Sequence, residues 1–240
     1  MNARVLLVAA ATLASPAVQA QTVDEIVSRY LAARGGREAL AAIRTVRMTG
    51  RMFAGPGREA IVRREIARPG RIRTEFEFQG TTGVYVWDGS RGSRVSPLEG
   101  TLEPEPLSDE AAALSAEQAD IDGPLVDWRA KGHAVELVGT TTLPGGAAHE
   151  LKVALKTGGT RLLWIDDATG LLVKSASSRT VGGHALQIET TYGDYRRTDG
   201  VLFARSIETG AAGRPRRLSI VVDSVEANPV LEDGRFRMPH

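Results

Sequence analysis

The residues from 71 to 78 alternate strictly between two kinds of side chain. Four would point to one side of an extended chain and four to the other: Ile72, Thr74, Phe76 and Phe78 against Arg71, Arg73, Glu75 and Glu77. Successive side chains of a β-strand point to opposite faces of its sheet. The segment therefore predicts a strand with one apolar face and one charged face that is solvated.

Similar segments recur almost to the C-terminus, separated by turn sequences such as Asp88-Gly89 and Thr198-Asp199-Gly200. We expect a turn at 80–83 and strands at 45–53, 59–67, 71–79, 84–87, 92–96, 133–142, 149–156, 160–166, 171–179, 185–195, 201–209 and 216–226. Short strands joined by tight turns predict a mainly β protein built on a single antiparallel sheet that is bent or rolled.

A few helices accompany this sheet. Thr22 and Glu25 form a capping box that starts an N-terminal helix, and Gly35-Gly36 ends it. A second short helix is expected at 37–43. These two helices precede the first strand.

The strand rhythm breaks between residues 97 and 132. We expect a polar loop at 97–106 and a helix at 108–118 with Ser108 as its N-cap. A further short helical piece is expected from Pro124 through Trp128 to Lys131-Gly132.

The N-terminus has the features of a secretory signal. Residues 5–14 are apolar but too short to span a bilayer comfortably, and Val18-Gln19-Ala20 offers small residues for cleavage. We expect a signal peptide at 1–20, cut after Ala20, and one mature soluble domain at 21–240 in the periplasm. An uncleaved anchor helix is the alternative. Gln21 follows the cut, so no lipid is attached to a cysteine there.

Composition excludes several classes of site. The chain has no cysteine, which excludes disulfides and thiolate metal sites. Its 30 basic and 29 acidic residues leave no electrostatic signature of nucleic-acid binding. None of the four histidines has the spacing of a metal motif, so we expect no metal and no cofactor.

No catalytic motif stands out. Asp166-Asp167 occupies the tip of a predicted hairpin, where aspartates commonly serve turn geometry. We therefore expect no catalytic residues and a protein that is not an enzyme. A hydrolase using Asp166 or a histidine remains an alternative.

Three apolar-rich places could hold a ligand: the sheet face from 48 to 86, a later face that includes Trp164, and the helical insertion. The candidate ligand-binding residues are Met48, Met52, Ile72, Phe76, Phe78, Val84, Val86, Leu114, Trp128 and Trp164. One interpretation is an ordinary core in a ligand-free structural protein of the envelope. The other is that the helices cannot fill the sheet, which leaves an apolar cavity suited to an acyl chain.

Several weak motifs occur in a specific order across the mature chain. They are the signal and the first helix, Arg68-Pro69 before an alternating strand, Asp88-Gly89 followed by Pro97, Ile165-Asp166 with Thr169-Gly170, and the terminal Phe236-Arg237-Met238-Pro239. In these features the chain resembles the outer-membrane lipoprotein-sorting superfamily of the LolA/LolB type. The resemblance implies an unclosed β-barrel with helices as a lid over a hydrophobic cavity.

The resemblance also implies a function. It suggests a monomeric carrier of a lipid or lipidated protein that delivers its cargo to an acceptor protein of the envelope. Arg68 would be the arginine that ties the lid to the barrel, reaching carbonyls within 107–128. The chain is longer than the lipoprotein carrier and has no cysteine at the cut, so it resembles other paralogues of the superfamily more than the carrier or the lipid-anchored receptor.

Overall fold

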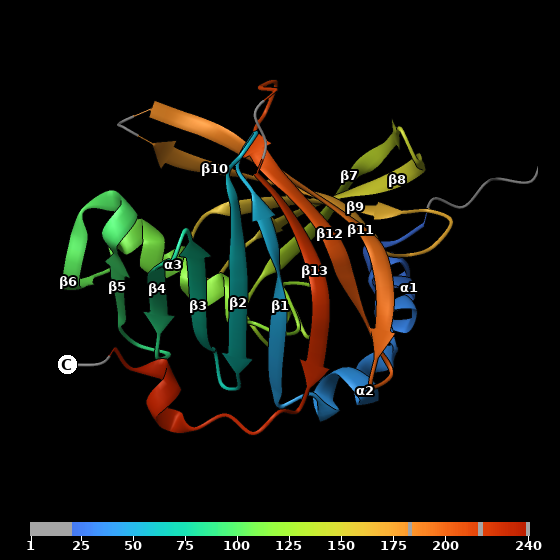
Figure 1. Cartoon of the computed structure of the whole chain (residues 1–240). Helices are drawn as coiled ribbons and strands as arrows, with labels where there is room; N and C mark the ends of the chain where they lie inside the picture. The colour runs from blue at the N-terminus through green and yellow to red at the C-terminus, as the bar shows by residue number, and fades with distance from the viewer. Residues whose placement is uncertain (1–20, 182–183, 216–217, 239–240) are drawn as a thin grey trace, which may run out of the picture.

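The computed structural model describes residues 21–181, 184–215 and 218–238 (Figure 1). The predicted signal peptide and its cleavage site lie outside the described residues, apart from Gln21. No helix in the described ranges is long and apolar enough to cross a membrane.

The elements follow the predicted order closely. The N-terminal helices and the first strands are α1 (Val23–Arg34), α2 (Gly36–Ala42), β1 (Thr45–Phe53), β2 (Glu59–Ala67), β3 (Arg71–Phe78), β4 (Thr81–Trp87) and β5 (Gly92–Ser96). The middle of the chain forms the 3-10 helix η1 (Pro97–Glu99), β6 (Thr101–Pro106) and α3 (Asp109–Gln118). The remainder forms β7 (Ala134–Leu143), β8 (Gly146–Ala154), β9 (Thr160–Asp166), β10 (Leu172–Val181), β11 (His184–Thr198), β12 (Val201–Ala211), β13 (Leu218–Ala227) and the 3-10 helix η2 (Asp233–Phe236).

All the described strands belong to one 13-stranded sheet in the order β6-β5-β4-β3-β2-β1-β13-β12-β11-β10-β9-β8-β7. The chain makes one antiparallel meander from β1 to β6 and a second from β7 to β13. The pairing of β1 with β13 joins the two meanders at the middle of the sheet. The sheet curves without closing, because β6 and β7 form opposite edges (Figure 1). The predicted unclosed β-barrel is confirmed.

The N-terminal helix begins as its sequence predicts. The backbone N–H of Thr22 donates to Glu25 Oε2 at 2.7 Å, and the N–H of Glu25 donates to Thr22 Oγ1 at 3.3 Å. Gly35 ends the helix with φ at 123°. A Cβ at this position would lie 2.2 Å from the carbonyl oxygen of Gly200, so only glycine fits. This close approach lets α2 turn directly onto the sheet.

The main core lies on one face of the sheet, which we call the inner face. Its strand residues include Val46, Ile66, Leu151 and Leu163, and the buried side of α1 packs against them. The 119–132 segment adds buried apolar residues to the same core. We call the opposite side of the sheet the outer face.

The outer face of β1–β3 carries an ion-pair network. Glu65, only 2% exposed, accepts hydrogen bonds from Arg47 Nε and Arg235 Nε, each at 2.9 Å. Arg73 and Arg235 both donate to Glu75. The C-terminal segment that contains η2 packs here, against β3. The sequence prediction that this charged face is solvated is therefore wrong at Arg73 and Glu75, because residues from the far end of the chain cover them.

Two local predictions are also wrong. The expected loop at 97–106 contains η1 and the strand β6. Pro104 and Pro106 are tolerated in this strand because it is an edge strand, where a missing N–H need not break a ladder on both sides. The expected helical piece from Pro124 is formed by turns instead. Its Leu125 and Val126 are nevertheless buried in the main core, so packing rather than helix propensity shapes this segment.

Candidate ligand-binding face

Four of the predicted ligand-binding residues lie on the inner face in a half-buried state. They are Met48 and Met52 of β1, with Phe76 and Phe78 of β3. The Phe76 ring packs edge-on against Tyr85 of β4, with 6.0 Å between the ring centroids and 84° between the ring planes. Large apolar side chains that remain partly uncovered on one face suit contact with an apolar ligand.

Two more predicted residues lie against the main core. Ile72 is only 4% exposed and belongs to the core itself. Trp128 packs against the core from the 119–132 segment, and the guanidinium carbon of Arg129 lies 3.9 Å from the centroid of its ring. These side chains contribute to packing on the inner side of the sheet.

Val84 and Val86 are on the outer face, so their predicted place beside Phe76 is wrong. A two-residue turn joins β3 to β4 and pairs Phe78 with Thr81. Residues opposite one another share a face, so the even-numbered residues of β3 lie with the odd-numbered residues of β4. Val86, 3% exposed, packs instead with Phe236 of the C-terminal segment.

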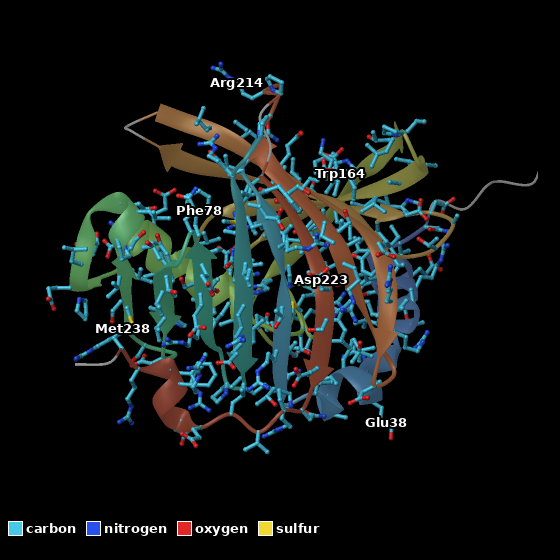
Figure 2. All side chains as sticks on the ribbon, in the orientation of Figure 1. Glu38, Phe78, Trp164, Arg214, Asp223 and Met238 are labelled. Atoms are coloured by element: carbon cyan, nitrogen blue, oxygen red, sulfur yellow. The ribbon has the colours of Figure 1, made fainter. Side chains whose placement is uncertain are left out.

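Trp164 of β9, labelled in Figure 2, also lies away from the main core. Its neighbour Leu163 belongs to the main core, and alternation along the strand places Trp164 on the outer face. There it is 7% exposed and packs with Ala148 and Ala176. The ammonium group of Lys174 lies 4.8 Å from the centroid of its ring. Trp164 is therefore shielded from solvent, as expected of an interior residue, but its expected place on the same side as Phe76 and Phe78 is wrong.

The helix α3 crosses the inner face without being deeply buried. It packs against β3 and β4, and none of its residues is fully buried. Leu114, the predicted ligand-binding residue of this helix, is half-buried. At the end of the helix, Glu117 Oε2 accepts a hydrogen bond from Arg161 Nε on β9 at 2.9 Å, and a second from Arg161 Nη2. Thus α3 connects the two arms of the curved sheet.

Arg68, between β2 and Pro69, reaches two other segments. Its Nη1 and Nη2 donate to the two oxygens of the Asp122 carboxylate at 2.6 and 2.5 Å. Its Nε donates to the Ile43 carbonyl at 2.8 Å, and Nη2 donates to the Leu40 carbonyl at 3.2 Å. The arginine therefore does contact the inserted region, but through a carboxylate. The carbonyls that it binds belong to the end of α2.

Charged groups around Asp122 keep its carboxyl ionised. Burial raises the pKa of Asp122, but the hydrogen bonds and charge of Arg68, with the charges of Lys131 and Arg34, bring the pKa below its ordinary value of 3.8. The hydrogen bond with Asp122 also raises the pKa of Arg68, against the effect of burial. Both partners are therefore charged at neutral pH.

Other polar contacts fix the 119–132 segment to its surroundings. Arg34 of α1 donates to the Asp122 carbonyl at 3.3 Å and to the Tyr30 hydroxyl at 3.1 Å. Within the segment itself, Lys131 Nζ donates to Asp120 at 2.5 Å and to the Gly123 carbonyl at 2.9 Å. The segment is thus anchored to α1 and to the end of β2, while α3 before it is anchored to β9.

Sequence reasoning missed Asp122, Glu117 and Arg161. Asp122 and Glu117 belong to no motif, and their partners are distant in the chain. The β9 strand has apolar residues on both faces from 162 to 165. Alternation therefore gave no reason to expect Arg161 on the inner side.

Two hollows formed by the described residues bear on the predicted cavity. One, of about 370 Å³, lies on the outer face and is lined by Arg47, Thr49, Arg63, Glu65, Glu226 and Arg235. The other, of about 620 Å³, lies at the β4–β6 edge beside the start of α3, and its lining includes Trp87, Pro104 and Leu107. Neither is lined by any of the ten predicted ligand-binding residues. The predicted apolar cavity stays a prediction.

Asp166 serves turn geometry. Its Oδ1 accepts hydrogen bonds from the backbone N–H of Thr169 at 2.7 Å and from the Thr169 hydroxyl at 2.6 Å. The described residues contain no group of three or more His, Cys, Asp or Glu that could hold a metal ion.

One histidine does contact a carboxylate. His149 Nε2 lies 2.9 Å from Asp167 Oδ1, and Nδ1 lies 3.4 Å from the Thr140 hydroxyl. Arg29 of α1 also donates to Asp167, at 3.2 Å. The Asp167 side chain thereby links the hairpin between β9 and β10 to the N-terminal helix.

The sequence matches no family model and no curated protein. The three-dimensional structure does match solved structures. A LolA superfamily protein from Nitrosomonas europaea aligns over 91% of this chain and 99% of its own, with a TM-score of 0.58 and 15% identity. The chain has the fold of the LolA superfamily.

Two further structures share this LolA-like fold. An outer membrane lipoprotein-sorting protein domain from Vibrio parahaemolyticus aligns over 88% of this chain and 94% of its own, with a TM-score of 0.56 and 12% identity. A DUF1329 family protein from Desulfovibrio piger aligns over 90% of this chain and 97% of its own, with a TM-score of 0.59 and 11% identity. The superfamily resemblance read from the sequence is confirmed at the level of the fold.

Proposed function

We propose that this protein is a periplasmic carrier or binding protein that holds an acyl chain of a lipid or lipidated protein against the inner face of its half-barrel. One observation carries the proposal. Met48, Met52, Phe76 and Phe78 are only half-buried, and they share the inner side of the sheet with a helix that buries none of its own residues. The LolA-like fold supports the same interpretation.

The polar contacts of the insertion support a lid that opens. Apolar ligand entering beneath α3 would displace the helix and strain the contacts of Arg68 and Arg161 with the inserted region. A hydrogen bond to a charged group contributes about 1.5–3 kcal/mol, which is enough to bias a two-state lid by tenfold or more. Closure of the lid and retention of cargo would then compete.

The first experiment tests retention of cargo. Lipids extracted from the purified protein are identified by mass spectrometry, and the amount retained is compared between wild type and Phe76→Glu. Ile61→Glu is the matched control, because Ile61 is a 50% exposed apolar residue on the outer side of the adjacent strand. We expect Phe76→Glu to lose most of the lipid while Ile61→Glu retains it. No bound lipid in wild type would favour the ligand-free structural protein.

The second experiment tests the latch. Arg68→Leu removes the contacts with Asp122 and α2, so we expect it to hold a fluorescent acyl probe more tightly and to transfer it more slowly to acceptor vesicles. Arg51→Leu is the control, since its pair with Asp223 is exposed to solvent on the outer face, away from the inserted region. Equal transfer rates for wild type and Arg68→Leu would contradict the latch.

Loss of turnover of an ester substrate in His149→Ala would favour the hydrolase alternative.

A further inference from the structure

Arg64 of β2 lies on the inner face among the half-buried apolar residues. It is opposite Met48 on β1 and opposite Thr74 on β3. Met48 packs against the main core, and Thr74 is buried. Residues opposite one another in a sheet share a face, so Arg64 points to the same side. Tyr192 of β11, from the other arm of the sheet, is close enough to affect its ionisation.

The guanidinium of Arg64 lacks a counter-charge within the described part of the chain. Its Nε is covered and has no hydrogen-bond partner there. Arg71 and Arg205 also have an unpaired Nε, but Arg71 Nη1 pairs with Asp233 at 2.6 Å, and Arg205 Nη2 donates to Thr198 at 3.2 Å. Arg64 differs from both, because no described carboxylate, hydroxyl or carbonyl receives its terminal nitrogens.

Burial lowers the pKa of Arg64, with a smaller opposite effect of Tyr192. An arginine side chain nonetheless stays protonated in proteins. The phenol of Tyr192 supplies no counter-charge, because burial raises its pKa; its hydroxyl lies 3.1 Å from the Ser175 hydroxyl. A partly covered cation without a counter-charge is unfavourable, and such groups concentrate at functional sites.

We propose that Arg64 binds the anionic oxygen group of the acyl ligand, which is either the carboxylate of a fatty acid or the phosphate of a phospholipid. This inference rests on the proposed function, because the acyl chain would lie against the neighbouring Met48 and Phe76. The arginine fork donates two parallel hydrogen bonds to either group. The negative charge of the ligand would serve as the counter-charge that the described part of the chain does not provide for Arg64.

The test uses three ligands with the same acyl length and different head groups: dodecanoate, dodecyl phosphate and dodecanol. Each displaces the neutral probe N-phenyl-1-naphthylamine from the purified protein. We expect wild type to bind at least one of the two anions about tenfold or more tightly than dodecanol, as a charge-assisted hydrogen bond predicts. The anion that binds more tightly identifies the fatty-acid or the phospholipid source.

Variants of two adjacent arginines assign this preference. Arg64→Met should abolish it while still binding dodecanol, and Arg64→Lys should restore part of it. Arg63→Met is the matched control, because Arg63 lies on the outer side of the same strand, with Nη1 4.0 Å from Glu75. It should keep the full preference. Because Arg64→Met removes an unpaired charge, its thermal unfolding midpoint should not fall.

Three results would overturn the inference. Equal affinity of wild type for the two anions and dodecanol would show that no head-group site exists. An unchanged preference in Arg64→Met would place the site elsewhere, and both results would leave the acyl carrier intact. No displacement of the probe by any of the three ligands would remove the proposed function together with this inference.

Discussion

The helices α1 and α3 pack on the inner side of the same sheet, but different interactions hold them there. Four residues of α1 are fully buried in the main core: Ile26, Val27, Tyr30 and Leu31. None of the α3 residues is fully buried, and Glu117 at its end is tied to Arg161 by hydrogen bonds. Apolar burial therefore fixes the first helix, and polar contacts contribute much of what fixes the second.

This difference indicates which helix can detach more easily from the sheet. Each fully buried large side chain contributes about 1.5–3 kcal/mol through the hydrophobic effect, so several together make local detachment of α1 rare. Segments with few buried contacts open at much lower free energy. An apolar ligand would accordingly enter beneath α3, next to Phe76 and Phe78, rather than beneath α1.

The largest expected effect contrasts the two helices directly. Leu31→Ala should lower the free energy of unfolding by about 2–5 kcal/mol, because it opens a cavity in the main core. Leu114→Ala on α3 should cost only about 1 kcal/mol or less, because that side chain is half-buried. Urea unfolding of both variants measures these costs. Equal costs would show that α3 is as firmly packed as α1.

A smaller effect is expected from the charged contact of α3. Arg161→Met removes the hydrogen bonds to Glu117, so the backbone amides of α3 should exchange with solvent about tenfold faster or more. The amides of α1 should be unchanged. Hydrogen exchange followed by mass spectrometry measures both helices in one sample, and Glu117→Gln should reproduce the effect from the other partner. Uniform acceleration over the sheet would instead indicate global destabilisation.

The smallest effect concerns the segment that joins α3 to the core. The pKa of Asp122 is lowered in the folded protein, so its contact with Arg68 adds stability above pH 3.8. That contribution is lost as the pH falls through the lowered folded value. Asp122→Asn should be less stable at neutral pH and should lack this acid component. Urea unfolding at a series of pH values compares the two proteins, and parallel pH profiles would contradict the assignment.

Local sequence patterns predicted most elements of this fold. The capping box of Thr22 and Glu25 predicted the start of the first helix. The predicted strands at 45–53, 59–67 and 160–166 have the observed bounds. These signals act over a few residues, through capping, alternation and turn geometry, so they can be recognised from the sequence alone. They were sufficient to predict an antiparallel curved sheet.

The face of the sheet that a side chain occupies was predicted less well, because it depends on whether the residue is at an odd or an even position along its strand. The turn before β4 has two residues rather than the expected four, but either even length places Val84 and Val86 opposite odd-numbered residues of β3, so grouping these valines with Phe76 was an error of alternation. In β9, apolar residues on both faces concealed that Leu163, rather than Trp164, joins the main core. A shift of one residue reverses every side chain of a strand, so an error of one position in the alternation becomes a complete error in a predicted site.

The sequence by itself determined the strands, the turns and the apolar character of one face. Only the tertiary structure decided that β1 pairs with β13, that Arg68 meets Asp122 and that the C-terminal segment covers Glu75. Likewise, only the folded sheet shows that Arg64 lies on the inner face and that no carboxylate of the described chain pairs with its guanidinium. These contacts join residues that are far apart in the chain. Their hydrophobic and electrostatic contributions depend on burial and on distances between charges, which the folded structure alone defines.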